Sequence, residues 1–348
     1  MMRTILGAML LLLALAVAGP ASAASFDCSK ATTAFEKAIC DNPKLSADDD
    51  TLAVAFATAI GGLSKPAVTA MRAEQRAWLD FAAKSCTDNA EPLSDFDTYT
   101  DNQIECLGLA FATRTGVLEQ SRMLGGRRFA VSSRYSALPD PDAVDDPTSY
   151  WKVATHQLTY PVLDGDKSEA AGFDSFISDT VASVSGSITD EGGDTMSDAQ
   201  SDTTVDITLS EVVGTRVTLK VMTNWFGHGA AHSNWGITYA HYLLGRKRAM
   251  EAGDIFAGDG WEKTLTDIAT TELKREHGDN LQLDGVEDLG AIITDPSRWS
   301  FGSDYGLTIQ FEPYEVAAYA YGAPTIVVPW ESLSDIMSES SDSVRYGS

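Results

Sequence analysis

Two histidines, His228 and His232, lie four residues apart in the glycine-rich segment FGHGAAHSNW. On a helix, this spacing places two imidazoles on one face, where they bind zinc if a third ligand and an orienting hydrogen-bond partner are present. Only a structure can place the other candidate ligands, His156 and His241, relative to this pair. Because glycine disfavours a helix, we expect a turn between two strands, with His232 hydrogen-bonded to the backbone. The alternatives are an exposed binding loop that includes Asn234, and a metal site.

A second candidate site is the tripeptide Pro313-Tyr314-Glu315, which follows a strand-like run. One interpretation is a turn that ends the strand, with Tyr314 packed against the protein. The other is a surface patch in which Tyr314 anchors a partner, because aromatic side chains often dominate binding interfaces. The partner-binding candidates are therefore His228, His232, Asn234, Pro313, Tyr314 and Glu315.

The motifs of several common enzyme classes are missing from the chain. It contains no G-x-S-x-G elbow, no H-E-x-x-H helix and no phosphate-binding loop. GHGAAH ends in histidine, so it is not a dinucleotide-binding fingerprint. We expect a protein that is not an enzyme and that needs no cofactor or metal.

The first residues have the pattern of a secretory signal peptide. Arg3 supplies a positive charge, Ile5–Val17 is apolar, and Ala21-Ser22-Ala23 is a small-residue cleavage site. We expect cleavage near Ala23 and a periplasmic or secreted protein without stable membrane insertion. Four cysteines follow, and an oxidising compartment favours two disulfides. Four cysteines can be paired in three different ways. Sequence proximity favours Cys28–Cys40 and Cys86–Cys106.

The chain is strongly acidic, with a formal net charge of -25 from 50 acidic and 25 basic residues. Such a surface repels nucleic acid and anionic membranes, and it attracts basic partners. The simpler interpretation is that the charge keeps an exported protein soluble.

Residues 24–125 predict a small helical domain. Thr33 and Glu36 form a capping box for a first helix, and Ser46 is expected to cap a second, with Asp48 to Asp50 in its first turn. Ser64 with Pro66 opens a third helix. A fourth begins near Asn102.

The rest of the chain predicts a linker, an α+β domain with a largely antiparallel sheet, and a disordered tail. Residues 126–148 contain the Pro- and Asp-rich run RYSALPDPDAVDDPT and are expected to be the linker. Runs of strands set apart from helices then favour α+β over residues 149–336. We expect residues 190–203 to be an acidic loop and residues 337–348 to be disordered.

The segment Phe26–Leu118 resembles the LprI-type lysozyme-inhibitor N-terminal family. The resemblance rests on FDCSKATTAFEKAICDNPKLSADD, on MRAEQRAWLDFAAKSC with its Gln75-Arg76-Trp78 cluster, and on a closing cysteine followed by ATRTGVLEQ. It implies a disulfide-bonded helical domain outside the cytoplasm.

Residues 149–335 resemble the exported domain of RsiV-type proteins. FGHGAAHSNW is similar to the family's Gly-Gly-Ala-His turn, with Ala230 where glycine is more usual, and FEPYEVAAYAYGAPTIVVPWESL matches its Pro-Tyr-Glu segment and terminal strand. This resemblance implies recognition of lysozyme.

We therefore expect an exported protein that binds lysozyme, or a related basic wall-degrading enzyme, and inhibits it by non-covalent occlusion. The alternative is an envelope accessory or sensor domain that recognises peptidoglycan or a wall-processing partner. A metal-dependent hydrolase at His228 and His232 is the third hypothesis.

Overall fold

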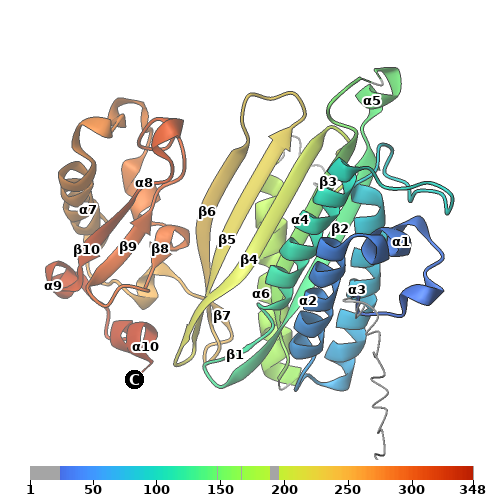
Figure 1. Ribbon diagram of the computed structural model, residues 1–348. Coiled ribbons are helices and arrows are strands. Elements are labelled where there is room, and N and C mark those ends of the chain that lie inside the picture. The colour runs from blue at the N-terminus through green and yellow to red at the C-terminus, as the bar shows by residue number, and fades with distance from the viewer. Residues whose placement is uncertain (1–23, 147, 166, 189–195, 348) are drawn as a thin grey trace, which may run out of the picture.

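Three groups of elements follow one another along the chain in the computed structural model, which describes residues 24–146, 148–165, 167–188 and 196–347 (Figure 1). A helical region lies on one side of a large central sheet, and a smaller α+β region lies on the other side. The predicted signal peptide (1–23) and residues 190–195 of the predicted acidic loop fall outside the described residues. No helix within the described ranges has the length and apolar character needed to cross a membrane.

The helical region has the caps that its sequence predicts at two of its helices. Thr33 and Glu36 form the expected capping box, and Ser64 caps the third helix by accepting a hydrogen bond from the backbone of Ala67. Side chains such as Trp78 and Phe111 fill the core between these helices. The elements are η1 (Cys28–Lys30), α1 (Ala34–Asp41), α2 (Pro43–Ala59), α3 (Lys65–Ser85) and α4 (Asp101–Leu118).

The predicted start of the second helix at Ser46 is wrong. Asn42 is the N-cap of α2, because its side chain accepts hydrogen bonds from the backbone of Lys44 and Leu45, and Pro43 occupies the first helical position. Ser46 is buried inside the helix, and Asp48 to Asp50 lie beyond its first turn.

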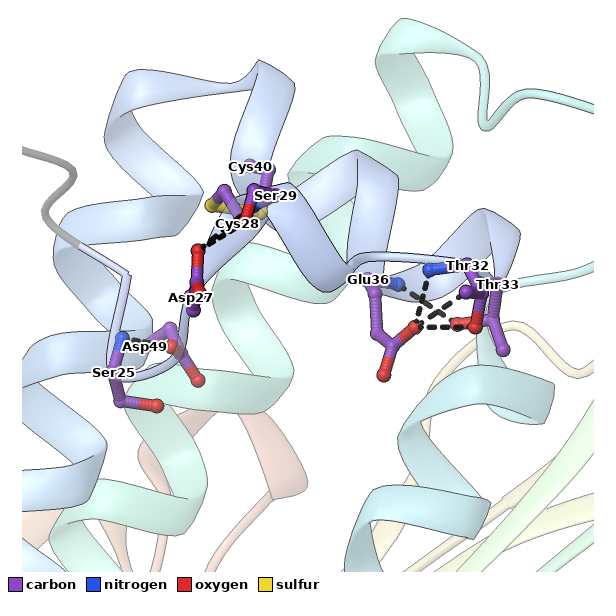
Figure 2. Close-up of a disulfide and its surroundings, with 9 residues drawn as sticks. All are labelled: Ser25, Asp27, Cys28, Ser29, Thr32, Thr33, Glu36, Cys40 and Asp49. Atoms are coloured by element: carbon purple, nitrogen blue, oxygen red, sulfur yellow. Dashed lines mark hydrogen bonds between the residues drawn. A yellow bond between two sulfur atoms is a disulfide. The ribbon is translucent and has the colours of Figure 1, made fainter.

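Both predicted disulfides are present. Cys28 is bonded to Cys40, and Cys86 to Cys106, each with a Cα–Cα distance of 5.7 Å. Figure 2 shows that the first bond ties η1 to the end of α1, beside the Asp27 side chain that caps η1. Each disulfide closes a loop within the helical region and so restricts its unfolded chain.

The central sheet has seven strands in the order β1 to β7. Only β3 and β4 are parallel, and α6 connects them; all other neighbours are antiparallel. The expected α+β fold with a largely antiparallel sheet is confirmed. The elements are β1 (Met123–Leu124), β2 (Arg127–Pro139), α5 (Pro141–Asp145), β3 (Val153–Leu163), α6 (Lys167–Ile188), β4 (Ser201–Val213), β5 (Arg216–Gly227), β6 (Asn234–Leu243) and β7 (Arg248–Ala249).

The predicted linker over residues 126–148 is wrong for its first half, because β2 pairs with β3 along its whole length. This strand also joins the sheet to the helical region. Buried Arg114 of α4 donates to the hydroxyls of Ser133 and Tyr135, both at 3.0 Å, and Glu74 of α3 accepts from the Ser132 hydroxyl at 2.7 Å. Leaving such buried polar groups unpaired is costly, so the helices and the sheet are fixed to one another.

The C-terminal region has its own apolar core around Trp299 and a three-stranded sheet in the order β10-β9-β8. The predicted disorder of residues 337–348 is wrong for α10, because the Val344 side chain is buried and its carbonyl accepts a hydrogen bond from Arg216 at 2.8 Å. The elements are η2 (Ala252–Asp254), α7 (Trp261–His277), η3 (Gly278–Asn280), η4 (Leu283–Gly285), α8 (Leu289–Thr294), η5 (Pro296–Arg298), β8 (Trp299–Ser300), β9 (Gly306–Gln310), η6 (Tyr319–Tyr321), β10 (Thr325–Pro329), α9 (Trp330–Leu333), η7 (Ser334–Ile336) and α10 (Ser341–Tyr346).

Candidate functional site

The glycine-rich segment forms the turn between β5 and β6. β5 ends at Gly227 and β6 begins at Asn234, and the two strands pair up to the turn. Within the turn, the amide of Ala230 donates to the carbonyl of Gly227 at 2.9 Å, and Gly229 has φ of 84°, a conformation that favours glycine. The predicted turn between strands is confirmed.

The side chain of His228, the first histidine of the turn, is almost fully covered. Only 6% of its side chain is exposed. Its Nδ1 is hydrogen-bonded to the buried carboxylate of Asp140, and its Nε2 lies 3.4 Å from Oδ2 of Asp202. The ring also stacks on Trp151, with an interplanar angle of 17°. His228 therefore holds the base of the turn to the ends of β2 and β4 and does not belong to the exposed surface.

His232, the second histidine, is exposed and contacts a different part of the chain. Its Nδ1 lies 3.1 Å from the carbonyl oxygen of Ser233, so the expected backbone contact is present. Its ring stacks on Tyr319, with the centroids 4.2 Å apart, and its Nε2 lies 3.5 Å from the hydroxyl of Tyr314. The rings of Tyr314 and Tyr319 are themselves 5.0 Å apart. We call His232, Tyr314 and Tyr319 the aromatic cluster.

The turn does not bring its two histidines together as metal ligands, because each ring has its own neighbours. In the residues that the structure describes, no group of three or more His, Cys, Asp or Glu side chains is arranged to hold a metal ion. The other two candidate ligands are hydrogen-bonded elsewhere: His156 Nε2 lies 2.6 Å from the Asp198 carbonyl, and His241 Nε2 lies 3.0 Å from the Trp299 carbonyl.

Tyr314 is held in an unusual backbone conformation. Its φ is +67°, in the left-handed region that costs an L-residue about 1–2 kcal/mol, and its side chain is 62% exposed. Residues in this conformation persist only where their surroundings enforce it, and they concentrate at functional sites.

An ion pair enforces the turn at Tyr314. The guanidinium of Arg298 donates two hydrogen bonds to the Glu315 carboxylate, at 2.9 and 3.0 Å. The same carboxylate accepts from the backbone amide of Glu312 at 2.8 Å. Bidentate arginine–carboxylate pairs are directional, so Glu315 fixes the path of the backbone on both sides of Tyr314.

Glu312 packs closely against β6. Its Oε1 lies where a side chain on Gly236 would begin: a Cβ there would be 2.8 Å from it. Burial raises the pKa of Glu312, Arg298 counteracts that rise, and Glu315 adds to it. The lack of a side chain at Gly236 thus lets Glu312 lie directly against β6, close to the β5–β6 turn.

The structure brings some of the predicted candidates together and separates others. His232 and Tyr314 meet, Glu315 supports Tyr314 through its ion pair, and Pro313 lies in the same turn. Asn234 is exposed at the start of β6, opposite Trp225. Tyr319 was missed, although the aromatic run YAYG around it was a visible signal.

A protein-family model matches the part of the chain that contains the two tyrosines. A family model described as "Protein of unknown function (DUF3298)" matches residues 253–331, which include Tyr314 and Tyr319 but not the β5–β6 turn. The comparison with curated proteins gave no match.

Two solved structures are similar to the chain. A DUF3298 family protein from Pseudomonas aeruginosa PAO1 is 14% identical with a TM-score of 0.44, and the alignment covers 64% of this chain and 97% of that one. A DUF3298 member from Bacteroides fragilis is also 14% identical with a TM-score of 0.44, over 63% of this chain and 96% of its own. Residues 253–331 thus match the model of the DUF3298 family, whose function is unknown.

Proposed function

We propose that this protein is exported and binds lysozyme, or a related basic wall-degrading enzyme, through the aromatic cluster. The observation that carries the proposal is the exposed Tyr314 ring, held in a left-handed backbone conformation by the Arg298–Glu315 ion pair. The ring is exposed and its backbone is fixed on both sides, so the side chain is presented to the solvent from a rigid turn.

The cluster has the properties of a binding anchor. Tyrosine gives a large contact area for little conformational entropy, and such residues dominate interface energies. His232 and Tyr319 support the Tyr314 ring from one side, so the ring is ordered before a partner arrives. Preorganisation of this kind reduces the entropic cost of binding.

The identity of the partner is supported by charge and by resemblance. The chain has a formal net charge of -25, and animal-type lysozymes are basic, so association is favoured electrostatically at low ionic strength. The N-terminal segment resembles LprI-type lysozyme inhibitors, and residues 149–335 resemble RsiV-type domains. These two resemblances concern different parts of the chain and lead to the same partner.

The proposed mechanism is non-covalent occlusion of the enzyme's active cleft by the β5–β6 turn and the turn at Tyr314. It requires neither a cofactor nor a bond-making step, and in this proposal the protein is not an enzyme. The protein would act outside the cytoplasm, where its two disulfides persist.

An inhibition assay tests the proposal. Lysozyme activity on cell walls is measured with increasing amounts of wild type, of Tyr314→Gly, and of Tyr305→Ser as the control. Glycine adopts the positive φ of residue 314 without strain, so this variant removes the ring and keeps the turn. Tyr305 is 71% exposed and lies at the other end of β9.

We expect wild type and Tyr305→Ser to inhibit equally, and Tyr314→Gly to need at least about tenfold more protein, as for loss of an aromatic hot spot. Full inhibition by Tyr314→Gly would contradict the assignment to the aromatic cluster. Absence of inhibition by wild type, with binding to isolated peptidoglycan, would replace the proposal with a wall-recognition function.

A further inference from the structure

The helical region carries an exposed aromatic residue that packing does not explain. Phe96 lies in the connection between α3 and α4, and its side chain is 98% exposed, the largest fraction among the large apolar side chains of the described residues. Isolated apolar side chains on a surface are common, but a phenylalanine with almost no contact to its own chain is a candidate anchor for another molecule.

The backbone on both sides of Phe96 is held in place. The Lys37 ammonium donates to the carbonyl of Asp95 at 2.8 Å, and the Ser94 hydroxyl donates to the Asp97 carboxylate at 2.6 Å. Further along, the Tyr99 hydroxyl donates to the carbonyl of Ala83 at 3.0 Å. The Cys86–Cys106 disulfide closes the whole connection. Phe96 is thus presented from a fixed loop, which reduces the entropic cost of using it as an anchor.

A pocket adjoins this loop. It has a volume of about 220 Å³ and lies between α1 and residues 97–99, with Ala38, Asn42 and Ile104 among its lining residues. Asp41 and Asp97 contribute carboxylates to its lining, and Lys37 contributes one ammonium group. An exposed ring beside a pocket gives a surface with one projection and one depression, which can interlock with a partner.

The charge around Phe96 indicates which kind of partner fits. Between Cys86 and Cys106 the sequence contains six acidic residues and no lysine or arginine. The acidic residues of the loop outnumber the single positive charge of Lys37 beside it, so the loop favours a partner that offers lysine or arginine side chains around an apolar depression, because like charges at an interface are unfavourable and opposite charges speed association.

We propose that the Cys86–Cys106 loop, with Phe96 as its anchor and the adjoining pocket, is a second protein-binding surface that takes a basic protein. The inference rests on the proposed function, since lysozyme is the basic partner that we assign to it. In Figure 1 the helical region and the C-terminal strands lie on opposite sides of the central sheet, so this surface is separate from the aromatic cluster.

Calorimetric titration with an animal-type lysozyme at low ionic strength tests this inference, with the full chain as wild type, Phe96→Ser and Tyr305→Ser. The Phe96 ring contributes almost nothing to the core, so Phe96→Ser should unfold at the same temperature as wild type, as should the exposed control. If one lysozyme contacts both surfaces, Phe96→Ser raises Kd by at least about tenfold. If each surface binds its own lysozyme, the stoichiometry falls from two to one.

A Phe96→Ser isotherm that superimposes on that of wild type overturns the inference and leaves the proposed function intact. Absence of lysozyme binding by wild type overturns both. A charge variant separates the electrostatic contribution to the association rate from the contact made by the Phe96 ring. Glu91→Gln should slow association about threefold at low salt and have no effect at high salt, where charges are screened.

Discussion

The two histidines of the β5–β6 turn lie four residues apart, yet one belongs to a buried joint and the other to an exposed surface. His228 is enclosed by Asp140, Asp202 and Trp151, which come from segments before β5. His232 is exposed and contacts Tyr314 and Tyr319, which come from the C-terminal region. His228 therefore attaches the turn to the rest of the sheet, whereas His232 lies on the exposed surface of the turn.

This difference shows that the role of each histidine depends on what the rest of the chain places beside it. The buried carboxylate of Asp140 and the stacked indole of Trp151 make His228 part of the fold, because the imidazole provides a hydrogen-bond partner for a carboxylate that cannot reach water. The neighbours of His232 are the exposed Tyr314 and the partly buried Tyr319, and they leave its own ring exposed and available for a partner. The comparison makes separate predictions for stability and for binding.

The largest effect on stability is expected from His228→Ala. It leaves the carboxylate of Asp140 buried without its imidazole partner, and it removes the ring that stacks on Trp151. Loss of a partner to a buried charge costs about 3 kcal/mol in the free energy of unfolding. Denaturant unfolding measures this loss.

His228→Asn is the matched control, because its side-chain amide can occupy the place of Nδ1 and still donate to Asp140. A loss for His228→Ala no larger than that for His228→Asn would contradict the structural role of the Asp140 contact.

A third histidine, His241, makes the stability of the protein depend on pH. His241 on β6 is buried, and this burial, together with the nearby positive charge of Arg216, lowers its pKa from about 6.5 to about 3. The folded protein therefore keeps His241 neutral at pH values where the unfolded chain binds a proton. Its contribution to stability is present above pH 6.5 and is lost progressively as the pH falls toward 3.

Between pH 7 and pH 5, this linkage lowers the free energy of unfolding by about 2 kcal/mol. Unfolding curves at the two pH values measure it, and His241→Gln serves as the control because it does not titrate. Subtracting the variant removes contributions from carboxyl groups such as Glu74, whose pKa is raised by burial and whose effect has the opposite sign. Equal pH dependence in wild type and His241→Gln would contradict the account.

The smallest effect on stability is expected from His232→Ala. The side chain is exposed, and substitutions at such positions change the free energy of unfolding by less than about 0.5 kcal/mol. Lysozyme binding should nevertheless weaken, because Tyr314 loses one of its two ring neighbours. Thermal unfolding and titration of the same sample measure both quantities. A stability loss as large as that of His228→Ala would remove the distinction between the two ends of the turn.

Local patterns were sufficient to predict much of the fold. The capping box at Thr33, the cap at Ser64, both disulfides and the β5–β6 turn depend on residues close together in the sequence. Ser46 was chosen wrongly because Asn42 provides a stronger start, with its own side chain and the following proline. Strand β2 was missed because the Pro- and Asp-rich run RYSALPDPDAVDDPT, which begins inside the strand at Arg134, dominated the composition, whereas its pairing partner lies farther along the chain.

The sequence identified individual residues of the candidate site but not the contacts between them. Pro313, Tyr314 and Glu315 were identified, but the meeting of Tyr314 with His232 joins positions 82 residues apart. The burial of His228 by Asp140 likewise joins positions 88 residues apart. Contacts of this kind depend on how the sheet and the C-terminal region pack, and no local pattern contains that information.

Direct titration of an animal-type lysozyme into wild type and Tyr314→Gly tests the central claim, that the exposed half of the turn and the Tyr314 ring bind the partner. The account predicts saturable binding to wild type at low ionic strength. It also predicts at least about tenfold weaker binding, or the loss of one bound lysozyme, for Tyr314→Gly at unchanged stability. Identical isotherms for the two proteins, or no binding by wild type, would contradict it.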